Sequence, residues 1–182
     1  MISPQEVLIL GAGSGNDVAS ALRNGAGHVD AIDIDREIAK LGKRYHLEHP
    51  YNSEKVSVVV DDARHFLRNC KKKYDLVNFA GLDSFTIVGQ GGSVTLCNYV
   101  YTKEAVQEAL RLLKPNGLMV LTFYRCNDWL SARLFKTLRE ASGYDPIVCS
   151  DAMALVAAAL YLCSAYFWMQ EKEKGVTTVA IP

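Results

Sequence analysis

The sequence predicts an α/β fold, because short apolar runs alternate with amphipathic stretches along most of the chain. Strands that alternate with helices form βαβ units, whose right-handed crossovers produce a parallel sheet covered by helices. The length of 182 residues, with 49% hydrophobic and 22% charged residues, fits about one soluble domain with its own core. We therefore expect a mainly parallel, doubly wound sheet.

The first part of the chain supplies four expected strands, each a short apolar or β-branched run. These strands are expected at 7–10, 28–33, 56–60 and 75–79. The amphipathic stretches between them predict three helices. The helices are expected at 17–24, from residue 37 onward, and from 63 to about 70. The strand-helix units on which the fold class rests are therefore concentrated here.

A long irregular segment at 80–98 follows the fourth strand and contains four glycines. A loop of this length at the carboxyl end of a parallel sheet is unusual unless it covers a site, so we interpret it as a substrate lid. Thr102 is a suitable N-cap for a helix at 103–113. Lys-Pro-Asn-Gly at 114–117 predicts a turn before a fifth strand at 118–123. Leucines at helical spacing then predict a helix that ends before Gly143.

The C-terminal region contains an uncharged stretch, 152–169, that is just long enough to cross a bilayer. Its alanines and polar residues make insertion energetically marginal. We therefore favour a buried helix, or a strand of a closing hairpin, over a membrane-associated helix. Residues 176–181 predict a final strand, which adds an antiparallel element to the sheet.

Equal numbers of basic and acidic residues, 20 of each, give a formal net charge of zero. The chain therefore lacks the broad basic field that binds a phosphate backbone, and we expect no nucleic-acid partner. Arg64, Arg68 and the lysines at 71–73 form a local basic cluster. We interpret this cluster as the solvated face of a helix.

The five cysteines are scattered and form no CxxC pair. This pattern argues against a disulfide framework and a zinc site, and it is typical of a reducing compartment. His46 and His49 could in principle bind a metal, but no nearby acidic residue or cysteine clearly completes a set, so we expect no metal. We expect a cytoplasmic protein, with a membrane-associated protein that carries a cytoplasmic domain as the alternative.

A Gly-rich turn follows the first expected strand at once, with glycines at positions 11, 13 and 15. Glycine allows a tight turn and a close approach of the backbone to a ligand, and the following helix offers free N–H groups. Asp33 ends the second expected strand, about 20 residues further on, where a carboxylate can accept both hydroxyls of a ribose. The strand, turn, helix and acidic residue together predict a nucleotide site at the carboxyl edge of the sheet.

The spacing of the glycines favours one class of nucleotide. The dinucleotide fingerprint G-x-G-x-x-G would place glycine at position 16, where this chain has Asn16. Gly11, Gly13 and Gly15 spell G-x-G-x-G instead, which resembles motif I of the class I methyltransferases. This resemblance implies a Rossmann-like class I fold and an S-adenosylmethionine-type cofactor, and it makes an NAD-dependent oxidoreductase the minor alternative.

Several segments resemble the spermidine synthase group within this fold, in unbroken order over roughly residues 5–140. The segments are Val-Leu-Ile-Leu-Gly-Ala-Gly-Ser-Gly at 7–15, Val-Asp-Ala-Ile-Asp-Ile-Asp at 29–35, Val-Val-Val-Asp-Asp-Ala-Arg at 58–64, Tyr-Asp-Leu-Val at 74–77 and Tyr-Thr-Lys-Glu at 101–104. The resemblance implies that Asp33 binds the ribose, that Ile34 packs on the adenine, and that Asp62 and Ala63 meet the adenine edge. Asp62 is equally suitable as a helix N-cap. The implied cofactor-binding residues are Gly11, Ala12, Gly13, Ser14, Gly15, Asn16, Asp33, Ile34, Asp62 and Ala63.

Two positions depart from the family pattern. Ser14 stands where aminopropyltransferases carry an aspartate in the glycine loop, and Ala80 stands where they carry the aspartate that deprotonates the attacking amine. Asp83 matches the second aspartate of that signature and is the candidate catalytic base, or a group that attracts a cationic substrate. A surface aspartate that starts a turn is the alternative for Asp83. Tyr99 and Tyr101 are candidate substrate contacts, although we expect one of them to pack against the following helix.

The resemblance implies a transferase in polyamine biosynthesis that binds S-adenosylmethionine or its decarboxylated form and moves an aminopropyl group to a polyamine. A small-molecule methyltransferase and a non-catalytic nucleotide-binding module, either free or tethered to a membrane, are the alternatives. The cofactor-binding transferase domain is then expected at 1–150, and 151–182 completes it. The family's β-rich N-terminal extension has no counterpart here, so we expect either a fragment of a longer protein or a site open to a partner, with a homodimer as one possibility.

Overall fold

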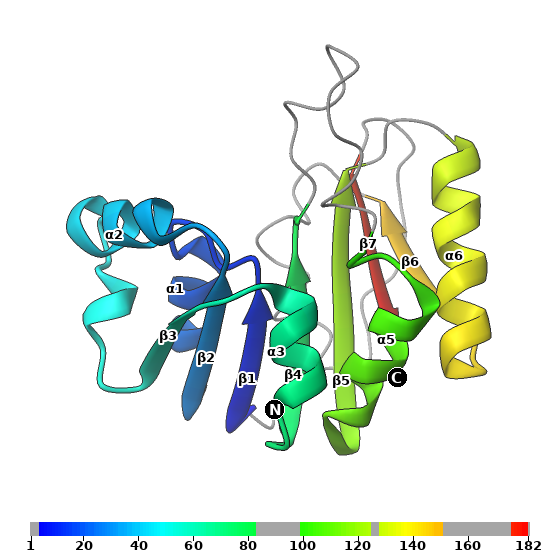
Figure 1. Cartoon of the computed structure of the whole chain (residues 1–182), viewed down its shortest axis with the longest axis horizontal. Coiled ribbons are helices and arrows are strands. Elements are labelled where there is room, and N and C mark those ends of the chain that lie inside the picture. Colours follow the sequence, from blue (N-terminus) through cyan, green and yellow to red (C-terminus); the bar gives the residue numbers. More distant parts are fainter. Residues whose placement is uncertain (1–3, 83–98, 125–127, 151–175, 182) are drawn as a thin grey trace.

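The computed structural model describes residues 4–82, 99–124, 128–150 and 176–181. Within these ranges the chain forms a seven-stranded sheet with the order β3-β2-β1-β4-β5-β7-β6. Figure 1 shows this sheet with helices on its two sides. The α/β class and the mainly parallel, Rossmann-like sheet expected from the sequence are confirmed.

The first five strands are parallel to one another, and the last two close the sheet. The parallel strands are β1 (Glu6–Leu10), β2 (His28–Asp33), β3 (Val56–Val60), β4 (Tyr74–Ala80) and β5 (Leu113–Tyr124). β7 (Val176–Ile181) runs antiparallel to β5, and β6 (Ile147–Ser150) runs antiparallel to β7. The expected final strand and its antiparallel pairing are therefore confirmed.

The helices that connect these strands are short and begin with clear N-caps in three cases. They are α1 (Asn16–Arg23), α2 (Arg36–Tyr45), the 3-10 turn η1 (Pro50–Asn52), α3 (Ala63–Asn69), α5 (Lys103–Arg111) and α6 (Asp128–Ser142). Asp35, Asp62 and Thr102 each accept a hydrogen bond from a backbone N–H in the first turn of the helix that follows. The predicted capping role of Thr102 is confirmed, and Asp62 is an N-cap as well.

The sequence missed one strand and misplaced the start of another. β6 has only four residues and its Ile147 and Val148 are exposed, so no alternating pattern marks it. β5 begins at Leu113 rather than at residue 118, because the predicted turn at 114–117 is accommodated inside the strand. The register jumps there, since Tyr74 pairs with Leu113 while Leu76 pairs with Leu118.

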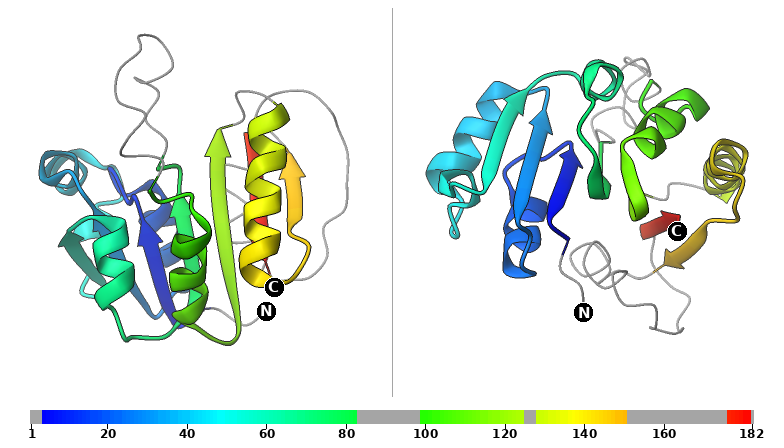
Figure 2. Two further views of the ribbon diagram at one scale, coloured as in Figure 1. Left: turned by 45° about the vertical axis from the view of Figure 1, so that its right-hand side comes forward. Right: turned by 90° about the horizontal axis from the view of Figure 1, so that it is seen from below.

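Two hydrophobic clusters fill the two faces of the sheet. One contains side chains from α3, α5 and α6, such as Leu67, Val106 and Leu138. The other contains Val18 from α1 and Tyr51 from η1. The two views in Figure 2 show the helices on opposite sides of the sheet. This distribution is that of a doubly wound fold.

The order of the strands reverses between β1 and β4, where consecutive connections leave in opposite directions. Ligands in open parallel sheets bind beyond the carboxyl ends of the strands at such a point. The glycine turn at 11–15 leaves β1 at this position, so the fold places the predicted nucleotide loop at the expected edge.

The uncharged stretch at 152–169 lies outside the described residues. Residue 151, where the expected C-terminal segment begins, lies outside them as well. In the described ranges, no helix combines the length and the apolar character that crossing a bilayer requires. The proposed burial or membrane association of 152–169 stays a prediction.

α2 packs directly on the glycine turn at Gly42, which is buried. A Cβ atom at Gly42 would overlap the carbonyl oxygen of Ser14 and would lie 2.8 Å from its carbonyl carbon. These contacts are with backbone atoms, which cannot rotate away. Gly42 therefore sets the distance between α2 and the turn.

We expect Gly42→Ala to lower the free energy of unfolding by about 1–2 kcal/mol, although alanine is the better helix former by up to about 1 kcal/mol. The overlap with Ser14 forces α2 away from the turn, and this cost exceeds the gain in helix propensity. Urea denaturation followed by circular dichroism measures the change. Lys43→Ala, on the exposed side of the same helix, is the control and should change the free energy by less than about 0.5 kcal/mol. A stabilised Gly42→Ala variant would contradict this packing.

Candidate functional site

The glycine turn after β1 adopts a backbone conformation that suits glycine at each of its three glycine positions. Gly11, Gly13 and Gly15 have φ angles of 78°, 53° and 102°, in the left-handed region. A Cβ at Gly11 would also collide with the side chain of Leu82, which follows β4. The turn therefore requires glycine for its conformation, and Leu82 lies directly against Gly11.

Asp33 holds the glycine turn against the end of β2. Its Oδ2 accepts a hydrogen bond of 2.6 Å from the Gly13 N–H, and its Oδ1 accepts one of 2.8 Å from the Asp35 N–H. The N–H groups of Gly11 and Ala12 donate to the Ile32 carbonyl oxygen at 2.8 and 3.0 Å. Gly13 of the predicted loop is thus in direct contact with Asp33, the residue that we expect to bind the ribose.

The end of β3 lies beside Asp33. The Asp61 N–H donates to the Asp33 carbonyl oxygen at 3.0 Å, and Asp62 follows as the N-cap of α3, accepting 2.9 Å from the His65 N–H. Ala63, the first residue of α3, is buried. Ile34 has 62% of its surface exposed, which is high for a large apolar residue beside a carboxylate. The predicted adenine-side residues therefore gather at adjoining strand ends.

Tyr51 supports the glycine turn through hydrogen bonds to two of its carbonyl oxygens. The sequence did not identify Tyr51 as a residue of the site. This residue is 6% exposed, and its hydroxyl donates to the carbonyl oxygens of Ala12 at 3.1 Å and Gly13 at 2.7 Å. Its ring and the Pro50 ring lie against Gly15, where a Cβ would come within 2.9 Å of Pro50 Cγ. No periodic pattern marks this residue, because it belongs to a three-residue 3-10 turn.

Carboxylates dominate the electrostatics around the turn. Burial raises the pKa of Asp17, in the first turn of α1. Burial also raises the pKa of the Tyr51 phenol, and the negative charges of Asp33 and Asp17 raise it further. The phenol therefore stays protonated and remains a hydrogen-bond donor to the turn. Asp17 follows the glycine turn directly in the chain, because α1 begins at Asn16.

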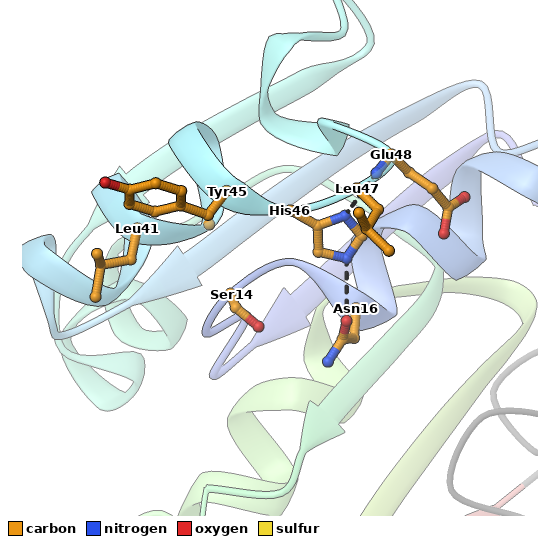
Figure 3. Close-up of a pocket in the computed structure, with 8 residues that line it drawn as sticks. Ser14, Asn16, Leu41, Tyr45, His46, Leu47 and Glu48 are labelled. Carbon is orange, nitrogen blue, oxygen red and sulfur yellow. Dashed lines mark hydrogen bonds between the residues drawn. The ribbon is translucent and has the colours of Figure 1, made fainter.

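Ser14 and Asn16, two further predicted cofactor residues, line a pocket on the α2 side of the turn (Figure 3). This pocket has a volume of about 460 Å³ and is also bounded by Leu41, Tyr45 and Leu47. The amide oxygen of Asn16 lies 3.0 Å from His46 Nε2, and His46 Nδ1 accepts 3.1 Å from the Glu48 N–H. Neither Gly13 nor Asp33 lines this pocket.

The acceptor side of the site is only partly described. Ala80 is the last residue of β4 and has no group that can accept a proton, and Asp83 lies outside the described residues, as does most of the expected lid. Tyr99 is exposed, whereas Tyr101 packs against the core cluster that includes Val106. The expectation that one of the two tyrosines packs inward agrees with this arrangement.

The interpretation of Arg64 as part of a solvated basic face is wrong. Arg64 is only 9% exposed and its guanidinium binds the carboxylate of Glu108. Arg68 and the lysines at 71–73 are exposed. No local sequence pattern indicates this difference, because the partner of Arg64 is 44 residues away on another helix. Among the described residues, no three potential metal ligands gather in one place.

Comparisons with known proteins place the sequence in one family. The sequence model of the spermine/spermidine synthase domain family matches residues 1–179. Polyamine aminopropyltransferase 2 of Hyperthermus butylicus is 30% identical over 141 residues, which cover 75% of this chain and 43% of that protein. The chain therefore spans less than half the length of this relative.

Solved structures show the same fold at low sequence identity. A spermidine synthase in complex with the transition-state analogue AdoDATO has a TM-score of 0.71 and 15% identity, over 98% of this chain and 54% of that one. Human methyltransferase-like protein 13 in complex with SAH has a TM-score of 0.64 and 16% identity, over 91% of this chain and 85% of that one. Both likenesses support the Rossmann-like fold.

We expect Tyr51→Phe to lower the free energy of unfolding by about 1–2 kcal/mol, because the carbonyl oxygens of Ala12 and Gly13 lose a buried donor. The turn should also open more often, so the Gly15 N–H should exchange with solvent faster. Urea denaturation and amide hydrogen exchange measure these two effects. Tyr45→Phe removes the hydroxyl of a tyrosine that is 63% exposed and is the matched control. Equal effects of the two variants would contradict a supporting role for Tyr51.

Proposed function

The chain belongs to the spermine/spermidine synthase family, as the resemblance in its sequence predicts, and we propose that it is a transferase that binds an S-adenosylmethionine-type cofactor. We propose further that it moves an aminopropyl group to a polyamine. The observation that carries this proposal is the position of Asp33, whose carboxylate joins the glycine turn to the end of β2.

Asp33 has the capacity to bind a ribose while it holds the turn. A carboxylate offers about four lone-pair positions, and the N–H groups of Gly13 and Asp35 use one on each oxygen. The remaining positions can accept two hydroxyl groups. Ile34 supplies an exposed apolar surface next to this carboxylate, which suits the face of an adenine ring. The Asp62 carboxylate, at the adjoining end of β3, can accept the exocyclic amine of that ring.

The charge of the site fits a cation. Within the described residues, Asp17, Asp33, Asp35 and Asp62 form no ion pair with lysine or arginine. Their negative charges favour a sulfonium group and the ammonium groups of a polyamine. The same charges disfavour a free carboxylate on the cofactor, so we propose that the decarboxylated form of S-adenosylmethionine is preferred.

The bound cofactor supplies a carbon atom that is activated by the neighbouring sulfonium. An amine nitrogen that attacks this carbon forms a C–N bond, the C–S bond breaks, and its electron pair remains on sulfur as a neutral thioether. The nitrogen must first lose a proton, because an ammonium has no lone pair. Ala80 cannot accept this proton, and we propose that Asp83 takes that role.

A small-molecule methyltransferase is the second candidate function. The observation that favours it is Ala80, since methyl transfer to an acceptor that is already nucleophilic does not need a base at the end of β4. A nucleotide-binding module without catalysis would share the same cofactor contacts. These alternatives differ in the group transferred, so binding and turnover must be measured separately.

Calorimetric titration with S-adenosylmethionine, its decarboxylated form and NAD tests the proposal. We expect sub-millimolar binding of an adenosyl sulfonium, tighter for the decarboxylated form, and no comparable binding of NAD. Incubation with an aliphatic diamine and the decarboxylated form should then yield the aminopropylated amine, detected by mass spectrometry. Binding without turnover of any amine would favour the module, and absence of all binding would overturn the proposed function.

Asp33→Ala tests the ribose contact. We expect the affinity for the adenosyl sulfonium to fall about 10- to 100-fold, which corresponds to the loss of hydrogen bonds to a charged acceptor worth about 1.5–3 kcal/mol. Glu54→Ala removes an exposed carboxylate away from these contacts and should leave the affinity within about twofold. Unchanged affinity in Asp33→Ala would show that the ribose lies elsewhere.

A further inference from the structure

Arg64 is a buried arginine in the first turn of α3, directly after Asp62 and Ala63. Its side chain is 11% exposed. Arginine is almost never buried without a partner, because desolvation of its charge is costly. The position of Arg64 beside the proposed adenine contacts makes the identity of its partners important.

The guanidinium of Arg64 binds three groups on one distant stretch of chain. Nε donates to Glu108 Oε2 at 2.9 Å and Nη2 donates to Glu108 Oε1 at 3.2 Å, which is a two-point contact between planar groups. Nη1 donates to the Tyr99 carbonyl oxygen at 2.6 Å and to Thr102 Oγ1 at 2.8 Å. Four hydrogen bonds thus join α3 to the turn at 99–102 and to α5.

The turn at 99–102 is where the chain re-enters the described structure before α5. Thr102 caps α5 through its Oγ1, which accepts 3.2 Å from the Ala105 N–H. The same oxygen accepts from Arg64, so the guanidinium and the start of α5 share one atom. Arg64 also holds Tyr99 next to α3 through the Tyr99 carbonyl oxygen. Arg64 itself directly follows Asp62 and Ala63 in the sequence.

We propose that Arg64 is a positioning residue for the transfer reaction. It fixes the turn that carries Tyr99 and Tyr101, the predicted acceptor contacts, relative to Asp62 and Ala63, the proposed adenine contacts. This inference rests on the proposed function. Arg64 touches neither the cofactor nor the acceptor in this role, and it acts by holding two parts of the site in one geometry.

The shape of the guanidinium is essential to this role. Arginine presents five N–H donors in one plane, whereas a lysine ammonium is a point charge on a flexible stem. Lysine at position 64 could keep the charge pairing with Glu108 but could not bind Glu108, Tyr99 and Thr102 in the same planar arrangement. Arg64→Lys therefore separates the positioning of the turn from the presence of a positive charge.

Arg68 provides a matched control. It lies one helical turn further along α3 and donates from Nε to the same Glu108 Oε1 at 3.2 Å. Its side chain is 65% exposed and no described contact joins it to Tyr99 or Thr102. Arg68→Ala removes an arginine from Glu108 and leaves the connection to the turn intact.

The experiment compares wild type, Arg64→Lys and Arg68→Ala in cofactor binding, steady-state kinetics with an aliphatic diamine, and amide hydrogen exchange at 99–106. For Arg64→Lys we expect a cofactor Kd within about threefold of wild type, a fall in kcat/KM for the diamine of about 10-fold or more, and faster exchange at 99–106. For Arg68→Ala we expect all three within about twofold. Measurements are made below the unfolding transition of each variant.

Glu108→Gln extends the test if Arg64→Lys is too unstable to assay. It keeps the size of the side chain and removes the charge that holds the guanidinium, so we expect a smaller change in the same direction. A folded Arg64→Lys variant with unchanged kcat/KM and unchanged exchange overturns the role of Arg64. Cofactor binding that falls in parallel with kcat/KM overturns it too, because that result indicates general loss of structure.

The wild-type measurement separates this inference from the function on which it rests. A wild-type chain that neither binds an adenosyl sulfonium nor modifies the diamine overturns the proposed function, and the role of Arg64 is overturned with it. An active wild type with an equally active Arg64→Lys variant overturns the role of Arg64 alone.

Discussion

Asp33 connects three segments that would otherwise be separate. Its two carboxylate oxygens accept from N–H groups of the glycine turn after β1 and of the start of α2, and its backbone carbonyl oxygen accepts from the N–H of Asp61 at the end of β3. Hydrogen bonds to a charged acceptor are shorter and stronger than neutral ones, so this residue can define the relative positions of the three segments. The proposed cofactor contacts all lie on those segments or beside them.

The glycine turn needs this support because its own conformation is unusual. Its three φ angles are all positive, and three glycines within five residues leave many conformations open to the unfolded chain, so folding of this turn costs more entropy than that of other residues. Tyr51 offsets this entropy cost through hydrogen bonds to two carbonyl oxygens of the turn. Gly42 allows the backbone of α2 to approach the turn from another side. A turn held in advance in this way loses less entropy when a ligand binds.

Local features of the site could be predicted from the sequence, whereas features that depend on distant contacts could not. The glycine spacing, Asp33 and the caps at Asp62 and Thr102 are readable because their partners lie within about 20 residues in a regular βαβ unit. Tyr51 reaches the turn across 38 residues from a short 3-10 turn, and Arg64 reaches Glu108 across 44 residues. Their side chains resemble ordinary surface or core residues in the sequence, and only the packing of separate elements shows their contacts.

Asp33 and Arg64 hold different parts of the proposed site in place. Asp33 organises the nucleotide half through backbone groups that any sequence with these glycines provides. Arg64 connects that half to the acceptor side through a buried ion pair, whose geometry depends on a single guanidinium. The departures from the family pattern at Ser14 and Ala80 fall outside both connections. The proposed cofactor contacts therefore do not depend on which residue accepts the proton of the amine.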